Sequence, residues 1–124
     1  MKKFVSIMNH TLTAEQLEQA KNFKGETLEV LEIKGPIVDP TASKDAVYDL
    51  AREYLDKLPK DTHYVNIMSD FGFTVAVATL LQSGVYGDII PIYATTNRVV
   101  NEVSNPDGSV TKTAVFKHVR FREY

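Results

Sequence analysis

The sequence predicts an α/β fold, in which four parallel strands form a sheet flanked by helices and a β-hairpin closes the chain. Up to residue 94, short apolar and β-branched runs alternate with helical patterns, and such alternation favours parallel strands joined by helical crossovers. Beyond that point, two strand-like segments surround a turn that contains proline and glycine. We therefore expect a βαβαβαβ core over residues 1–94 and a hairpin over 95–124, within one domain.

Composition narrows the class of protein. An apolar content of 44% and a charged content of 24% are ordinary for a folded globular chain. The absence of cysteine excludes disulfides, thiolate metal sites and cysteine nucleophiles, and it is compatible with the cytoplasm, where we expect the protein. No apolar run is long enough to cross a membrane, so we expect no membrane partner.

The charge of the chain is unevenly distributed. The net charge of -2 argues against binding DNA, yet from Lys112 onward there are four Lys or Arg residues and one acid. Because alternate strand residues share a face, we expect His118, Arg120 and Arg122 to form one row with Val119 and Phe121 behind them. Such a row is suited to a polyanion.

The individual elements have clear signals. Strands are expected at residues 4–8, 28–33, 63–68 and 89–93. Thr13 and Gln16 form a capping box for the first helix, which ends near Gly25. A second helix carries apolar residues at helical spacing over 47–58, and a third, from 74 to about 83, is apolar on all sides and therefore central. Pro91 lacks a ladder donor, which favours an edge or bulged position for the fourth strand.

The last two strands are expected at 99–104 and 109–116, on either side of the turn Asn105-Pro106-Asp107-Gly108. The arrangement of the first four strands is Rossmann-like, and in such open sheets ligands bind beyond the carboxyl ends of the strands. Three polar loops are expected there: Asn9, His10 and Thr11; Ser69, Asp70, Phe71 and Gly72; Thr95, Thr96, Asn97 and Arg98.

The second of these loops precedes a helix, where exposed backbone N–H groups around Gly72 suit a phosphate. Asp70 would repel an anion unless it caps the helix, holds a ribose hydroxyl or orients His10. Capping is the simplest of these explanations.

Several other classes of protein are disfavoured. The chain has neither the glycine-rich dinucleotide fingerprint nor the P-loop, which argues against a dinucleotide oxidoreductase and a P-loop ATPase. His10, Asp70 and His118 lack the spacing typical of metal ligands, and we expect no metal or other cofactor. Ser69, His10 and Asp70 do not fit a hydrolase triad, since the nucleophile elbow is absent and Ser69 and Asp70 are adjacent.

Four segments resemble a family of small stand-alone proteins that accompany type III CRISPR systems and are similar to the CARF domain, a Rossmann-like dimer that binds cyclic oligoadenylate. The segments are residues 9–16 (Asn-His-Thr-Leu-Thr-Ala-Glu-Gln), 69–72 (Ser-Asp-Phe-Gly), 94–98 (Ala-Thr-Thr-Asn-Arg) and 116–124. The resemblance spans nearly the whole chain. The family has serine before the first histidine, whereas this chain has Asn9.

The resemblance implies a single CARF-like domain that acts as a ring nuclease. Such a protein cleaves cyclic oligoadenylate, which we expect to be cyclic tetra-adenylate, at the interface of a homodimer without a metal, and so ends the antiviral signal. Cleavage of this kind needs an aligned 2′-OH, a base and donors for the charge that develops on phosphorus. His10, Arg98 and Arg120 are the catalytic candidates. The substrate-binding candidates are Asn9, Thr11, Ser69, Asp70, Phe71, Gly72, Phe73, Thr95, Thr96, His118 and Arg122.

Each assignment has a plainer alternative. His10 could simply form a hydrogen bond with a backbone carbonyl. Arg98 could form an ion pair with Glu102, and Arg120 or Arg122 with Glu123, while Phe73 could be a core residue. The main rival for the whole protein is a sensor or sponge that binds cyclic oligoadenylate without cutting it. Identities alone do not distinguish these, because catalysis depends on placement to within a fraction of an ångström.

Overall fold

The computed structural model describes residues 1–124, which form three α-helices, one short 3-10 helix and five strands. The elements are, in chain order, β1 (Lys3–Met8), α1 (Ala14–Lys21), the 3-10 helix η1 (Phe23–Gly25), β2 (Glu29–Lys34), α2 (Lys44–Asp56), β3 (Thr62–Met68), α3 (Phe71–Gln82), β4 (Ile90–Ser104) and β5 (Val110–Glu123). Helices and strands alternate as predicted up to β4.

All five strands belong to one mixed sheet in the order β2-β1-β3-β4-β5. The first four are parallel, and β5 pairs antiparallel with β4. The prediction of an α/β fold with flanking helices is confirmed. The sheet was expected to consist of four parallel strands, whereas it has a fifth strand, β5, which is antiparallel to its neighbour. The hairpin does not stand apart from the sheet, because β5 returns along β4 and becomes its fifth strand.

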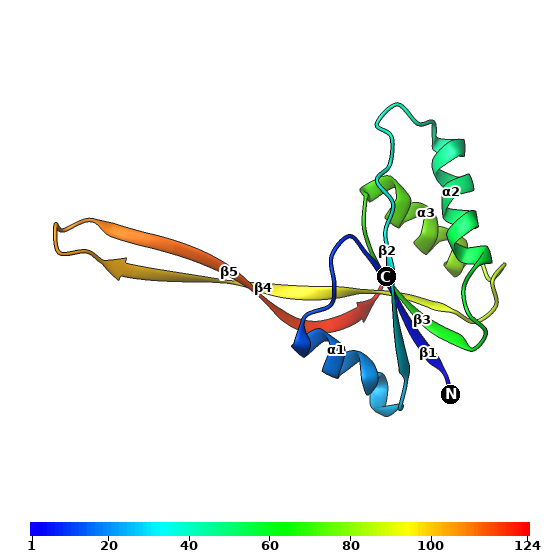
Figure 1. The fold of residues 1–124 in the computed structure, drawn as a ribbon, viewed down its shortest axis with the longest axis horizontal. Helices are drawn as coiled ribbons and strands as arrows, with labels where there is room; N and C mark the ends of the chain where they lie inside the picture. The colour runs from blue at the N-terminus through cyan, green and yellow to red at the C-terminus, as the bar shows by residue number, and fades with distance from the viewer.

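Helices cover both faces of the sheet (Figure 1). Alternation along β1 shows how: Phe4 faces the side covered by α1, whereas Val5 and Ile7 face the side covered by α2 and α3. The α1 side is filled by Phe4, Ala20, Leu28, Tyr64, Ile92, Ala94 and Phe121. The other core holds Val5, Ile7, Ala51, Leu55, Val65, Ile67, Phe73, Ala76, Val77 and Leu81.

Each of the three α-helices begins at a side-chain cap. In α1, the Gln16 N–H donates to Thr13 and the Gln16 side chain accepts from the Thr13 N–H, which confirms the capping box. Ser43 caps α2 and Asp70 caps α3. The third helix therefore starts at Phe71, three residues before the predicted start at Thr74. It lies against the sheet with a nearly wholly apolar sequence, as expected of a central helix.

The fourth strand is much longer than predicted. It runs without interruption from Ile90 to Ser104, so residues 95–98 are strand rather than loop. The reason is that β5 supplies hydrogen-bond partners along its whole length, and the β-branched threonines and valines of this stretch suit a strand. The strand is also internal, between β3 and β5, and Pro91 is accommodated as its second residue.

Residues 97–117 of β4 and β5 form a two-stranded ribbon that projects from the body of the molecule, and we call this ribbon the arm (Figure 1). Its tip is the predicted turn, in which Gly108 adopts a φ of 87° and its N–H donates to the Asn105 carbonyl. None of the helices is long and apolar enough to cross a membrane.

Ile92 packs β4 against the core on the α1 side of the sheet, and a substitution at this position tests that packing. Its side chain is fully buried, so Ile92→Ala is expected to lower the free energy of unfolding by about 2–5 kcal/mol in urea denaturation. Ile37 is 93% exposed in the connection before α2, and the matched change Ile37→Ala is expected to stay within about 0.5 kcal/mol of the parent. Equal losses in the two variants would contradict the described core.

Candidate functional site at the carboxyl edge

The loops after β1 and β3 meet at the carboxyl edge of the sheet. These strands are neighbours in parallel register and end opposite each other, at Met8 and Met68. Just beyond them, the Ser69 hydroxyl donates to the Asn9 side-chain oxygen over 2.6 Å. Two residues far apart in the sequence are therefore joined, as the crevice prediction requires. Asn9 occupies the place where the resembled family has serine, and it uses its amide to bind the hydroxyl of Ser69.

The end of β2 closes over this pair. The Gly35 N–H donates to the Met8 carbonyl over 2.8 Å, and the Asn9 amide donates to the Pro36 carbonyl over 3.3 Å. A Cβ at Gly35 would lie 2.6 Å from the Ser69 hydroxyl and 2.8 Å from the Asn9 oxygen. Only glycine allows the three segments to approach this closely.

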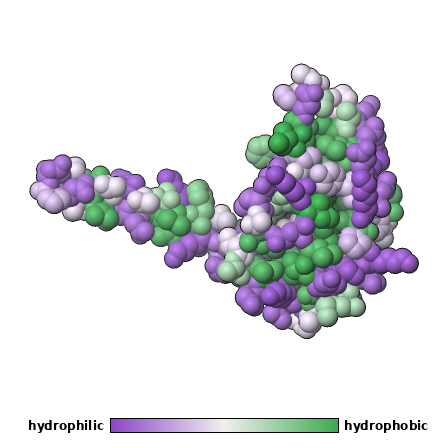
Figure 2. Space-filling view, in the orientation of Figure 1, coloured by the Kyte–Doolittle hydropathy of each residue, from purple (hydrophilic) through white to green (hydrophobic).

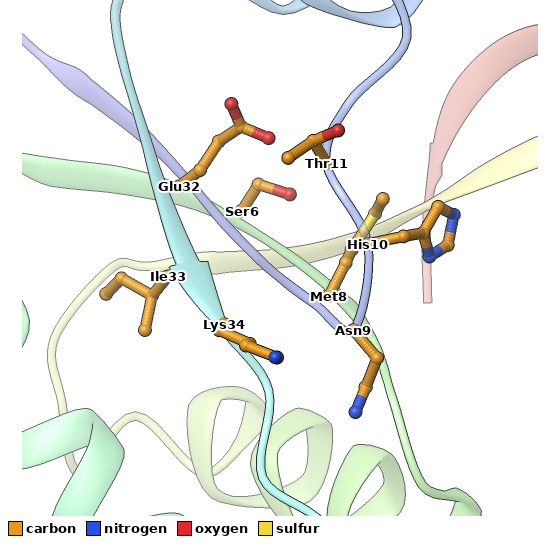
Figure 3. Close-up of a pocket in the computed structure, with 8 residues that line it drawn as sticks. All are labelled: Ser6, Met8, Asn9, His10, Thr11, Glu32, Ile33 and Lys34. Carbon is orange, nitrogen blue, oxygen red and sulfur yellow. The ribbon is translucent and has the colours of Figure 1, made fainter.

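A hollow of about 320 Å³ opens beside this junction, at the lower end of the size range of small-molecule sites. We call it the His10 hollow. It is lined by Ser6, Met8, Asn9, His10, Thr11, Glu32, Ile33 and Lys34, from β1, β2 and the loop after β1 (Figure 3). His10 and Thr11 are both exposed; Thr11 lies beside Glu32, whereas the His10 imidazole points to the far side of the loop, away from Glu32 and Lys34 (Figure 3). The first predicted loop thus contributes all three of its residues.

Sequence reasoning missed the contribution of β2. Glu32 and Thr11 lie at one end of the His10 hollow, and Lys34 and Asn9 lie at the other (Figure 3). The Glu32 carboxylate accepts the Leu12 N–H over 2.7 Å and so holds the loop after β1 in place. Lys34 is the only Lys or Arg in the lining. The available signal was position, since Lys34 ends a strand parallel to β1.

A buried polar group lies behind the wall of the hollow. The Asn66 amide nitrogen donates to the Ser6 hydroxyl over 3.0 Å and to the Met8 sulfur over 3.1 Å, while its amide oxygen is buried without a partner. An unpaired buried acceptor costs about 1–3 kcal/mol and calls for an explanation. Ser6 links this amide directly to the His10 hollow.

The predicted row of basic residues on β5 is wrong, because a bulge interrupts the alternation. Arg120 is opposite Thr95 and His118 is opposite Thr96, so Val119 has no partner. His118 is therefore turned inward beneath α1, with its ring 5.0 Å from that of Phe121. A single inserted residue separates His118 from the two arginines that follow.

None of the predicted arginines lines the His10 hollow. Arg122 lies over the Tyr93 ring, 5.0 Å from its centroid, and its Nε donates to the Tyr93 hydroxyl over 2.6 Å. The Nε of Arg120 donates to the Phe121 carbonyl, and this side chain lines a shallow depression next to α1 and η1. Arg98 lies on the arm, opposite Phe116. The expected convergence of arginines on the crevice does not occur within one copy of the chain.

The threonines of β4 have structural contacts of their own. The Thr95 hydroxyl donates to the Arg120 carbonyl over 3.0 Å and accepts the Arg120 N–H over 3.3 Å, which bridges the bulge. Thr96 and Asn97 are exposed on the strand. Thr95 is thus engaged in joining β4 to β5.

At the start of α3, the capping interpretation of Asp70 is confirmed. Its carboxylate accepts the Phe73 N–H over 3.1 Å, which places a negative charge where we expected a phosphate near Gly72. Phe73 is fully buried, with its ring 5.1 Å from that of Tyr54, so it is a core residue and not the substrate contact that we expected. Phe71, in contrast, is 92% exposed.

The geometry defines a small α/β protein with a polar hollow at the carboxyl edge and a projecting arm. The chain belongs to the family described as the Uncharacterized protein MJ1673 family, whose model matches residues 2–122. Uncharacterized protein MJ1673 of Methanocaldococcus jannaschii is 32% identical over 130 residues, which cover 100% of this chain and 98% of that relative. No solved structure matches the chain significantly.

His118 has a pKa below its ordinary value because burial disfavours the charged ring, an effect that Glu15 only partly offsets. Its Nε2 lies 2.9 Å from the Gln19 side-chain oxygen, while its Nδ1 is buried without a partner. Below about pH 6.5, His118 binds a proton more readily in the unfolded chain than in the folded chain. The free energy of unfolding is therefore expected to fall as the pH falls from 7 to 5.

His118→Gln removes this titration and is expected to make the free energy of unfolding less dependent on pH over that range. Urea denaturation at pH 7 and pH 5 measures the difference, with His63→Gln as the control that keeps the parental pH dependence. An unchanged pH dependence in His118→Gln would contradict the burial of a neutral ring.

Proposed function

We propose that this protein is a metal-independent ring nuclease that binds cyclic oligoadenylate, in particular cyclic tetra-adenylate, and cleaves it to linear products. In a type III CRISPR system this reaction would switch off the signal carried by the ring. The observation that carries the proposal is the hydrogen bond between Asn9 and Ser69, because it joins two separate segments of the family-like pattern, the first of which lines the hollow.

The proposed reaction uses the ribose of the substrate itself. The 2′-oxygen forms a bond to the adjacent phosphorus while the bond from phosphorus to the 5′-oxygen breaks. The 2′-hydroxyl gives its proton to a base, and the leaving 5′-oxygen takes a proton from water, so that the linear product ends in a 2′,3′-cyclic phosphate. Alignment of the 2′-oxygen with the leaving oxygen is a large part of such catalysis.

His10 is the proposed base or positioning group, since it belongs to the lining of the hollow and an imidazole is chemically suited to proton transfer. Lys34 is the proposed donor to the phosphate, as the ammonium group of the same lining. Thr11 and the amide of Asn9 offer further donors. The space is suited to one nucleotide unit rather than the whole ring.

A homodimer fits this proposal. Cyclic tetra-adenylate has an even number of identical units, and a two-fold pair of subunits presents two identical hollows to it. Arg98 and Arg120 keep their predicted catalytic roles only if they act on the substrate within a dimer, because neither guanidinium lines the His10 hollow of its own chain.

The second candidate function is a sponge or sensor that binds the ring without cutting it. The placement of the arginines specifically favours this alternative, since the hollow of one copy has Lys34 but no planar guanidinium for a transition state. Binding with slow or no cleavage is the behaviour expected of such a site.

Purified protein is expected to convert cyclic tetra-adenylate into linear products with a terminal cyclic phosphate in the presence of a chelator, as followed by liquid chromatography and mass spectrometry. Cleavage supports the nuclease. Tight binding with an intact ring supports the sponge, and the absence of both binding and cleavage contradicts the whole proposal.

His10→Ala is expected to slow single-turnover cleavage by roughly 100-fold or more while changing ring affinity only a few-fold, because it removes the base. Lys34→Ala is expected to weaken binding by roughly tenfold to 100-fold, as befits loss of a charged hydrogen bond. His63→Ala, at the amino end of β3, is the matched control with parental values. If the Arg120→Ala variant cleaves the ring at the parental rate, Arg120 has no part in the mechanism. If the His10→Ala variant does so, the assignment of His10 as the base is wrong.

A further inference from the structure

The arm leaves the carboxyl edge of the sheet without support from the rest of the chain (Figure 1). Residues 97–104 span about 25 Å at roughly 3.3 Å per residue, which is nearly twice the radius of gyration of a 100-residue domain. A two-stranded ribbon is only marginally stable by itself in water. An arm of this length therefore calls for a surface that covers it.

The arm carries apolar side chains that nothing in its own chain covers (Figure 2). They are Val100, Val103, Val110, Val115 and Phe116, and Phe116 is 68% exposed. The pairing of β4 with β5 places Val100, Val110 and Phe116 on one face, together with Arg98 and Glu102. We call this the Phe116 face of the arm.

A second uncovered apolar surface lies at the same edge of the molecule. It is a hollow of about 600 Å³ between the first turns of α2 and α3, lined by Ala42, Lys44, Val47, Tyr48, Phe71, Gly72 and Val75. Phe71 and Val75 are both exposed. We call this the α2/α3 hollow.

The surface area of the chain indicates how much is left uncovered. The protein exposes 7854 Å². A compact monomer of 13.9 kDa exposes roughly 6,700 Å², so the excess is about 1,200 Å². A stable dimer of standard size buries about 800 Å² per partner. Covering the arm and the hollow in a dimer of standard size would therefore remove about two thirds of this excess.

The charges of the two surfaces are complementary. The Phe116 face carries Arg98, while Glu102 on the same face is already ion-paired with Lys112 over 3.4 Å. The α2/α3 hollow has Lys44 in its lining and the Asp70 carboxylate beside Gly72, 3.5 Å from where a Cβ would stand. The unpaired cation of this face thus has an anion to meet on the rim.

We infer that two copies of the chain exchange arms, and that the Phe116 face of each arm packs into the α2/α3 hollow of the other copy. Both surfaces lie at the carboxyl edge, so one two-fold rotation forms both contacts and closes the assembly. Phe116 enters the hollow beside the second copy's Phe71, and Arg98 lies near the second copy's Asp70.

This arrangement also carries Arg98 to the carboxyl edge of the second copy, where it pairs with Asp70 and lies outside the His10 hollow. The dimer itself requires no nucleotide, so it is measured without one.

Sedimentation equilibrium of the full chain, free of nucleotide, tests the inference. The parent is expected to dimerise, and Phe116→Asp and Phe71→Asp are each expected to weaken the dimer by roughly 30-fold or more, because each places a charge in both copies of the contact. Thr113→Asp, on the opposite face of the same arm, is the matched control and is expected to keep the parental dissociation constant.

Mixing the two variants distinguishes arm exchange from any other dimer. A heterodimer of Phe116→Asp with Phe71→Asp retains one unaltered arm in one unaltered hollow, so the mixture is expected to associate more tightly than either variant alone. Replacing residues 98–116 by Asn-Gly keeps the Asn97–Lys117 pair in a tight hairpin and is expected to give a folded monomer. A monomeric parent, a dimer that survives loss of the arm, or a mixture that gains nothing would each overturn the inference.

Discussion

The pairing of β5 with β4, secured by Phe121, is the interaction on which the rest of the structure depends. Phe121 is almost fully buried, with its ring 5.1 Å from that of Phe4 and 6.0 Å from that of Phe23. These contacts tie the end of the chain to both β1 and the segment after α1. Because β5 is held in place there, it offers hydrogen-bond partners along β4, and both strands continue outward as the arm.

The bulge at Val119 follows from the same pairing and divides the basic residues of β5. On one side of it, His118 is buried, linked to Gln19 of α1 and kept neutral by its surroundings. On the other side, Arg122 stacks on Tyr93. The Gln19 amide also donates to the Val119 carbonyl, so α1 satisfies the carbonyl of the unpaired residue. The bulge is therefore a supported feature of the fold and not a local defect.

The polar hollow depends on a different constraint, the close approach of three strand ends around Gly35. Glycine permits Asn9 and Ser69 to meet, and Glu32 then fixes the loop that carries His10. In one copy, the cationic groups are divided among Lys34 in the hollow, Arg120 and Arg122 on the edge strand and Arg98 on the arm. An assembly of two copies is the simplest way to gather them, which connects the proposed substrate with the proposed exchange of arms.

Local features could be predicted from the amino-acid sequence: the alternation of strands and helices, the capping box at Thr13, the turn at Gly108 and the convergence of two polar loops on the carboxyl edge. These features depend on neighbouring residues and on the general geometry of parallel sheets. Contacts between distant segments were needed to place β4 inside the sheet, Phe73 in the core, His118 away from the arginines, and Lys34 in the lining of the hollow. The physical reason is that pairing register and bulges are set by contacts between distant segments, and one unpaired residue reverses the face of every side chain beyond it.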